Sequence, residues 1–113
     1  MRINLEVKRG DSLSLSFNCF DIRSQPQAIV GCAALLELIP TDGSEPGDEQ
    51  LIYNTDPDGG LEILENEGQV HWNIPYQTIE NFSGHDYKFA LQLIYPSSER
   101  ASTETMFLSI IED

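Results

Sequence analysis

Apolar and polar residues alternate through most of this sequence. In residues 12–20, "SLSLSFNCF", serines and an asparagine separate Leu13, Leu15, Phe17 and Cys19. A period of two is the pattern of a β-strand that buries one face and leaves the other in water. The same period is strictest in "YKFALQLIYP", where it aligns Tyr87, Phe89, Leu91 and Leu93. The alternation therefore predicts sheet, with little helix.

Strand-like stretches occur eight times, at residues 3–8, 12–20, 30–39, 51–54, 61–64, 69–74, 87–95 and 101–111. Turn residues separate them, as in "DPDGG" at 56–60 and "PSSER" at 96–100. Only residues 76–82, "YQTIENF", have helical spacing, and one turn of helix is the most we expect there. Many short strands with turns between them indicate an all-β sandwich or barrel.

The alternation also predicts which residues form the core. Ile3, Leu5 and Val7 share one face of the first strand. The predicted inward residues of the later strands are Cys32, Ala34, Leu36, Leu38, Val70, Trp72, Ile74, Met106, Leu108 and Ile110, in addition to the two alternating sets above. The stretch "VGCAALLELI" at 30–39 is apolar on its second face as well. A strand of that kind is expected at the centre of a sheet or beneath a covered surface.

A chain of 113 residues predicts one domain, residues 1–113, with a single core. No apolar run approaches the roughly 18 residues of a membrane span, and "MRINLEVKRG" lacks the apolar block of a signal peptide. We therefore expect a soluble, unprocessed intracellular product that does not contact a membrane. Cys19 and Cys32 are predicted to be reduced core residues, and a disulfide between them is the less favoured alternative.

The formal charge of −13 excludes some partners. So acidic a surface repels phosphate backbones, which argues against nucleic-acid binding. The acids are concentrated after residue 30, and "PTDGSEPGDEQ" at 40–50 is expected to be an acidic, exposed and mobile loop. The charge could serve solubility alone. Alternatively, the near-neutral first 30 residues lie in an interface while the acidic remainder faces water.

The tripeptide Arg9-Gly10-Asp11 is a cell-adhesion signal in other settings. Here it separates two strand-like stretches, where Gly10 can take a positive φ and the Asp11 side chain can bond to nearby backbone. We therefore interpret it as a turn.

Candidate catalytic and metal sites are sparse. His71 and His85 have no Cys or His at zinc-ligand spacing. Asp56, Asp58 and Glu67 match positions 1, 3 and 12 of an EF-hand loop, but Leu61 stands where that loop requires glycine. A looser calcium site at Asp56 and Asp58 remains an alternative to a solvated turn. No GxSxG or phosphate-binding glycine motif is present, so we expect no enzymatic activity, no cofactor and no metal centre.

Aromatic residues are the candidate partner-binding groups. Tyr53, Tyr76, Tyr95 and Phe107 exceed what one core of this size should need, and tyrosine is favoured at interfaces. We select Tyr53, Tyr95 and Phe107 as partner-binding residues. The alternative is that the aromatics cover the ends of the core.

The order of these features resembles a known family. "VKRGDSLSLSFNCFD", "AIVGCAALLELI" and "LIYNTDPDGGLEI" form the first half, and "EGQVHWNIPYQTIENFSGHDYKFALQLIYPSSERASTETMFLSI" forms the second. Together they resemble the small immunoglobulin-like β-sandwich proteins of tailed-bacteriophage virions, from the tail, tail fibre or baseplate. The resemblance spans nearly the whole chain and lies in patterned strands and turns. The acidic residues 42–67 depart from the family pattern.

The resemblance implies an immunoglobulin-like β-sandwich of about seven or eight antiparallel strands with at most one helical turn. It also implies a structural virion protein, made in the bacterial cytoplasm, that joins tail-fibre, baseplate or head–tail components in several copies. Two alternatives stay open. One is an acidic host-takeover protein that mimics DNA, and the other is a capsid decoration protein.

Overall fold

A computed structural model gives the fold and describes residues 3–18, 29, 31–45, 47 and 50–112. Its strands are β1 (Ile3–Lys8), β2 (Leu13–Asn18), β3 (Ala33–Glu37), β4 (Ile39–Pro40), β5 (Ile52–Asn54), β6 (Leu61–Leu64), β7 (Gln69–Ile74), β8 (Asp86–Phe89), β9 (Leu91–Ile94), β10 (Arg100–Ser102) and β11 (Met106–Ile111). The helical elements are a 3₁₀ turn, Glu65–Glu67, and α1 (Tyr76–Glu80). The all-β class and the single short helix predicted from the sequence are confirmed.

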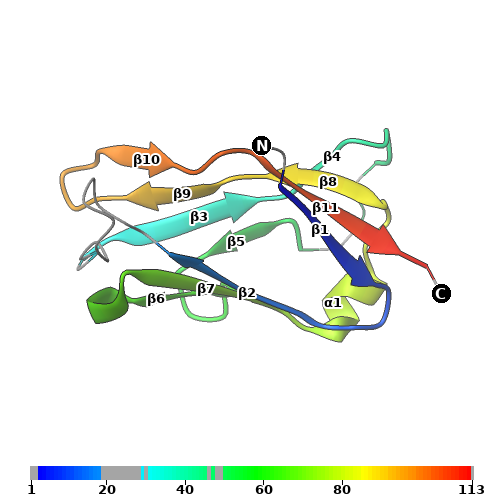
Figure 1. Cartoon of the computed structure of the whole chain (residues 1–113), viewed down its shortest axis with the longest axis horizontal. Coiled ribbons are helices and arrows are strands. Elements are labelled where there is room, and N and C mark those ends of the chain that lie inside the picture. Colours follow the sequence, from blue (N-terminus) through cyan, green and yellow to red (C-terminus); the bar gives the residue numbers. More distant parts are fainter. Residues whose placement is uncertain (1–2, 19–28, 30, 46, 48–49, 113) are drawn as a thin grey trace.

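The strands form two layers (Figure 1). The larger layer contains two hydrogen-bonded sets, β1-β11-β8-β4 and β10-β9-β3-β5. These sets are continuous, because β8 continues into β9 after Ala90, β3 into β4 after Leu38, and β10 into β11 after residues 103–105. The smaller layer is β2-β7-β6. When interrupted strands are counted once, the described residues form eight strands, at the eight predicted stretches.

One strand pair departs from the antiparallel expectation. β1 runs parallel to β11, with Ile3 opposite Met106 and Lys8 opposite Ile111, whereas the other strand pairs in the described residues are antiparallel. The reason is the connection that follows: after Lys8 the chain turns and enters β2 in the other layer. Because β1 joins the last strand of the larger layer before the chain crosses to β2 in the smaller layer, the sandwich has an immunoglobulin-like topology.

Trp72 occupies the centre of the core and is fully buried. Its ring centroid lies 5.1 Å from that of Phe89 and 5.4 Å from that of Tyr53, both in edge-on contact. The predicted inward residues of β3, β7, β8, β9 and β11 are buried around it, and Leu5, Leu13, Leu15, Phe17 and Cys32 are partly buried at its margin. Ile3, predicted to share a face with Leu5 and Val7, lies opposite buried Met106 and is 39% exposed at the start of edge strand β1. Cys32 has a free thiol, while Cys19 lies outside the described residues.

The link between β7 and β8 carries a second feature of immunoglobulin-like sandwiches. The hydroxyl of buried Tyr87, near the start of β8, accepts a hydrogen bond of 2.9 Å from the backbone N–H of Gly84. Such a bond back to the backbone at the corner before this strand is known as a tyrosine corner. Ile79 of α1 and Phe82 are buried beside it, so the corner fixes one end of the core.

The Arg9-Gly10-Asp11 segment forms the predicted turn. Gly10 has a φ of 98°, and the N–H of Asp11 donates to the carbonyl of Lys8. The Arg9 guanidinium donates to the carbonyls of Ile79, Glu80 and Phe82, at and beyond the end of α1. Arg9 therefore attaches the β1–β2 turn to the helix by contacts within the chain.

Asp42 anchors the first part of the acidic segment 40–50. Its carboxylate accepts backbone N–H donors from His85 at 2.8 Å, Ser44 at 3.1 Å and Asp86 at 3.4 Å. These bonds, that of His85 foremost, hold the pKa of Asp42 well below its usual range. The segment around Asp42 is thus tied to β8, while residues 46, 48 and 49 of the expected mobile loop lie outside the described residues.

Candidate functional site

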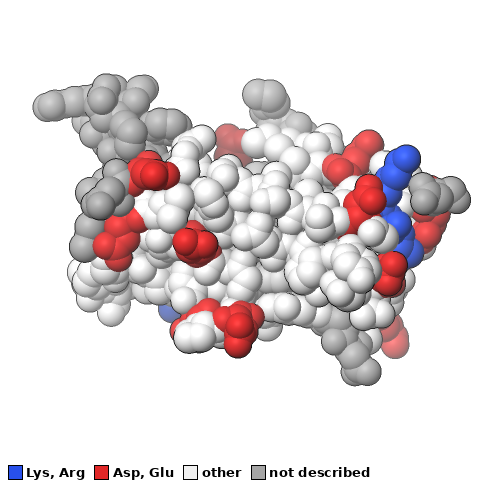
Figure 2. Space-filling view, turned by 90° about the horizontal axis from the view of Figure 1, so that it is seen from below, with Lys and Arg blue, Asp and Glu red and all other residues white. Residues whose placement is uncertain are grey.

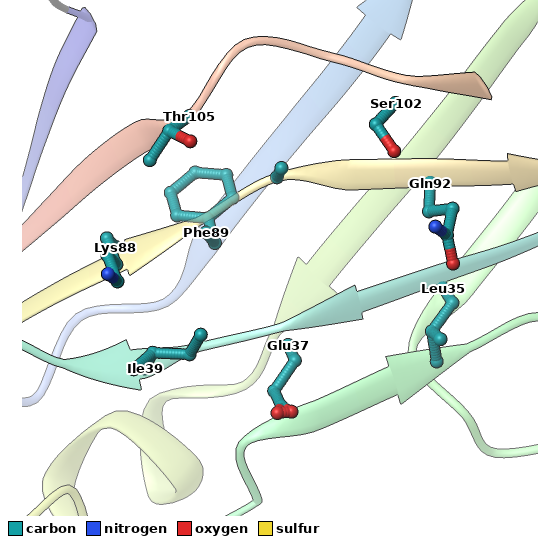
Figure 3. A pocket seen from close by; sticks show the side chains of 9 residues that line it. Leu35, Glu37, Ile39, Lys88, Phe89, Gln92, Ser102 and Thr105 are labelled. Carbon is teal, nitrogen blue, oxygen red and sulfur yellow. The ribbon is translucent and has the colours of Figure 1, made fainter.

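The candidate site is a groove on the outer face of the larger layer (Figure 3). It has a volume of about 320 Å³, and we call it the outer groove. Nine residues line it: Leu35, Glu37, Ile39, Lys88, Phe89, Ala90, Gln92, Ser102 and Thr105. They come from β3, β4, β8, β9, β10 and the two short interruptions beside Phe89 and Met106.

The strand interruptions explain why this face is hollowed. At Ala90, where β8 passes into β9, the side chain is small, and the neighbouring strand is interrupted at residues 103–105. Thr103 spans this interruption: its hydroxyl accepts from the N–H of Leu91, and its N–H donates to the Leu91 carbonyl. The backbone N–H and carbonyl of Leu91 are thereby hydrogen-bonded although the regular β-ladder is interrupted here. A depression remains above Ala90.

Alternation determines which side chains face outward. Because Leu36, Leu38 and Leu91 are buried in the core, their neighbours Leu35, Ile39 and Gln92 project to the opposite face. Ile39 is 44% exposed, and Ile52 of edge strand β5, paired with Glu37, is 55% exposed. The apolar second face predicted for residues 30–39 therefore lies on central strand β3 and edge strand β4 and lines the groove.

Charge is balanced in the groove although the chain is strongly acidic. The lining contains one acid, Glu37, and one base, Lys88, both exposed. Neither side chain forms an ion pair or hydrogen bond within the described part of the chain. Arg100 lies nearby on β10 and donates to the Gln92 side chain at 3.0 Å. This face therefore brings basic groups to an apolar surface.

The face of the smaller layer has a different character. The outward residues of β2 and β7 form an uncharged polar ladder, in which Ser14 bonds to Asn73 at 2.7 Å and Gln69 bonds to Asn18 at 2.9 Å. Figure 2 shows this side of the molecule, where acidic groups are separated by uncharged surface. The polar side chains of this ladder are already hydrogen-bonded to one another. The outer groove, by comparison, has more side chains without a partner among the described residues.

Of the three predicted partner-binding residues, Tyr53 is buried. It is 1% exposed, its ring contacts Trp72, and its hydroxyl donates to the Gln50 carbonyl at 2.9 Å. Burial raises the pKa of this phenol. The prediction that Tyr53 lies on the surface is wrong, because in β5 Tyr53 points inward and Ile52 outward.

Tyr95 and Phe107 are partly buried, in different places. Tyr95 follows β9 at the hairpin into β10 and packs against the margin of the core, as the alternative interpretation of the aromatics proposes. Phe107 projects outward between buried Met106 and Leu108, opposite Lys88 in the β11–β8 pair. Phe107 is thus the predicted residue that lies next to the outer groove. Tyr76 is 48% exposed on α1, away from this face.

Ile39 and Ile52 are exposed residues that the aromatic criterion missed. The signal was present in the sequence, since residues 30–39 and 51–54 are apolar at consecutive positions. Such a stretch shows that a second face is apolar but leaves open which face is inward.

The polar clusters have structural roles. His85 Nε2 lies 3.0 Å from Glu112 Oε1, and His71 Nε2 lies 3.2 Å from Gln69 Oε1. Asp56 and Asp58 belong to a turn closed by the Gly59 N–H to the Asp56 carbonyl. Over the described ranges, no three His, Cys, Asp or Glu side chains gather as a metal site would require.

Comparison with known proteins finds no protein-family model that matches the chain and no curated protein with significant similarity to it. In the part of the chain that is described, no helix has the length and apolar character needed to cross a membrane.

Proposed function

We propose that this protein is a non-enzymatic structural component of a tailed-bacteriophage virion. In this proposal it is a small β-sandwich adaptor that joins tail-fibre, baseplate or head–tail components and is present in several copies. It is made in the bacterial cytoplasm and ends in the particle. The family resemblance of the sequence supports the virion assignment, and the outer groove supports a role in docking.

The observation that carries the docking role is the exposure of Ile39 and Ile52 beside an apolar groove. Burying an isoleucine side chain fully contributes about 1.5–3 kcal/mol, so each of these half-exposed residues contributes roughly 1 kcal/mol. Two such contributions are too small to hold a complex alone. Several copies bound together make weak contacts effective, because later contacts form at high effective concentration.

The uneven charge supports the same role. Most acids lie after residue 30, yet the groove lining is neutral in sum. Charged residues are depleted at the centres of protein interfaces, and an acidic remainder keeps copies apart elsewhere. An apolar groove with a neutral lining in an acidic body therefore favours one docking orientation.

Mass spectrometry of purified phage particles tests the proposal. We expect peptides of this protein in intact particles in a fixed ratio to tail or head proteins, with labelling by electron microscopy giving its position. A position over the capsid shell would favour the decoration alternative. Early expression combined with absence from the particles would overturn the proposal and favour the DNA mimic.

A further inference from the structure

We propose that the occupant of the outer groove is a second copy of this chain, in a two-fold dimer joined by reciprocal Glu37–Lys88 ion pairs. This inference deepens the proposed function by naming the first partner. The two claims nevertheless have separate tests.

The arrangement of the two charges carries the inference. Ile39 lies opposite Lys88 in the β4–β8 pair and two residues after Glu37. Figure 3 shows Ile39 between the two charged side chains at the rim of the groove. Both charges are exposed and lack an ion-pair partner within the described residues.

In a two-fold dimer, the contact between Glu37 and Lys88 occurs twice. In an isologous interface, a residue i of one copy contacts j of the other, and j contacts i. An axis passing beside Ile39 places Glu37 of each copy against Lys88 of the other, with the two Ile39 side chains packed at the centre. The one acid and the one base that line the groove are thus self-complementary.

Net charge favours a second copy at this face over other faces. Two bodies of charge −13 repel each other, and an approach through acidic surface adds local repulsion. An approach through the groove meets one acid and one base, with Arg100 nearby. A strongly basic partner would instead be drawn to the acidic surface elsewhere.

The size of the face is sufficient. A standard protein interface takes about 800 Å² from each partner, and the whole chain exposes 6984 Å² in a body of 41 × 33 × 22 Å. One broad face of such a body supplies that area. Half-buried Leu35 and Phe107 add apolar surface to that of Ile39 and Ile52.

Charge exchange tests the dimer. Sedimentation equilibrium would compare the wild-type chain with Glu37→Lys, Lys88→Glu and the double variant. We expect a concentration-dependent dimer for the wild type and dissociation constants at least about tenfold weaker for both single variants, because each places like charges together. The double variant should return to the wild-type affinity.

Glu62→Lys is the matched control. It makes the same change in net charge as Glu37→Lys, on an exposed residue of β6 in the other layer. Lower net repulsion should leave its dimer as strong as the wild type or stronger, whereas Glu37→Lys should weaken it. Thermal unfolding of every variant would verify folding, which should be unaffected because the side chains are exposed.

A wild-type chain that stays monomeric, a double variant that fails to recover, or equal behaviour of Glu37→Lys and Glu62→Lys would overturn the dimer. A monomer found in purified particles would overturn the dimer and leave the proposed function standing. A dimer in solution, combined with absence of the protein from particles, would support the dimer and overturn the proposed function.

Discussion

Arg9 and Glu112 join the two ends of the chain, with Arg9 Nε 2.6 Å from Glu112 Oε1 across 103 residues of sequence. The same guanidinium donates to three carbonyls at and beyond the end of α1. The hydrogen bond from Arg9, together with that from His85, holds the pKa of Glu112 below its usual range. One arginine thus connects the first turn, the helix and the segment after β11.

Replacing Arg9 by alanine should therefore destabilise the fold. Hydrogen bonds to charged groups contribute about 1.5–3 kcal/mol each when well buried. Because these bonds are partly solvated, we expect a total loss of about 1–3 kcal/mol in urea unfolding. Asp11→Ala is the control: it also destroys the Arg-Gly-Asp tripeptide, but Asp11 is exposed, so stability should change by less than about 0.5 kcal/mol. Equal effects of the two variants would contradict the structural role of Arg9.

Asp42 should make stability depend on acid pH. Its pKa is lower in the folded chain than in the unfolded chain, where an aspartate titrates near 3.9. The unfolded state therefore takes up the proton first, so the stabilisation is present above about pH 4 and is lost as the pH falls below that value. Thermal unfolding across this range should show a steeper acid loss for the wild type than for Asp42→Asn.

Asp58→Asn serves as the control for that titration. The Asp58 carboxylate forms no hydrogen bond within the described residues, and asparagine tolerates its φ of 64°. The Asp58→Asn curve should follow the wild type. If Asp42→Asn also followed the wild type, the anchoring of this segment through Asp42 would be wrong.

Trp72 should be more sensitive to loss of volume than to loss of its indole N–H. Nε1 is buried and has no hydrogen-bond partner among the described residues, while the ring packs on Tyr53 and Phe89. Trp72→Ala should cost about 3–5 kcal/mol by leaving a cavity. Trp72→Phe should cost clearly less, because removing an unsatisfied N–H offsets part of the lost packing. If chemical denaturation gave equal losses of unfolding free energy for Trp72→Ala and Trp72→Phe, the unsatisfied N–H would not destabilise the fold.

The sequence predicted the layers well where one face of a strand is polar. In β7 and in β8 with β9, alternation identified Val70, Trp72, Phe89 and Leu91 as inward, and all are buried. It failed at β5, because "LIYN" is apolar at consecutive positions and too short to define its inward face. The number of aromatic residues and the preference of tyrosine for interfaces then assign Tyr53 to the surface, but Ile52 lies there instead.

Two other features depend on contacts between distant segments. The parallel pairing of β1 with β11 brings together strands at opposite ends of the chain, and no local pattern specifies its direction. The outer groove requires interruptions in two neighbouring strands at the same level, at Ala90 and at residues 103–105. The sequence indicated an apolar second face at 30–39, but not the hollow beside it.

The central claim is that the outer groove docks this protein into a larger assembly, and incorporation of variants into phage particles tests it most directly. Ile39→Asp places a charge in the groove, and Tyr76→Asp places one on an equally exposed residue of α1. Both variants should fold, as circular dichroism would verify. Quantitative mass spectrometry of purified particles should find Tyr76→Asp at wild-type levels and Ile39→Asp strongly depleted. Incorporation of Ile39→Asp at the wild-type level would contradict the account.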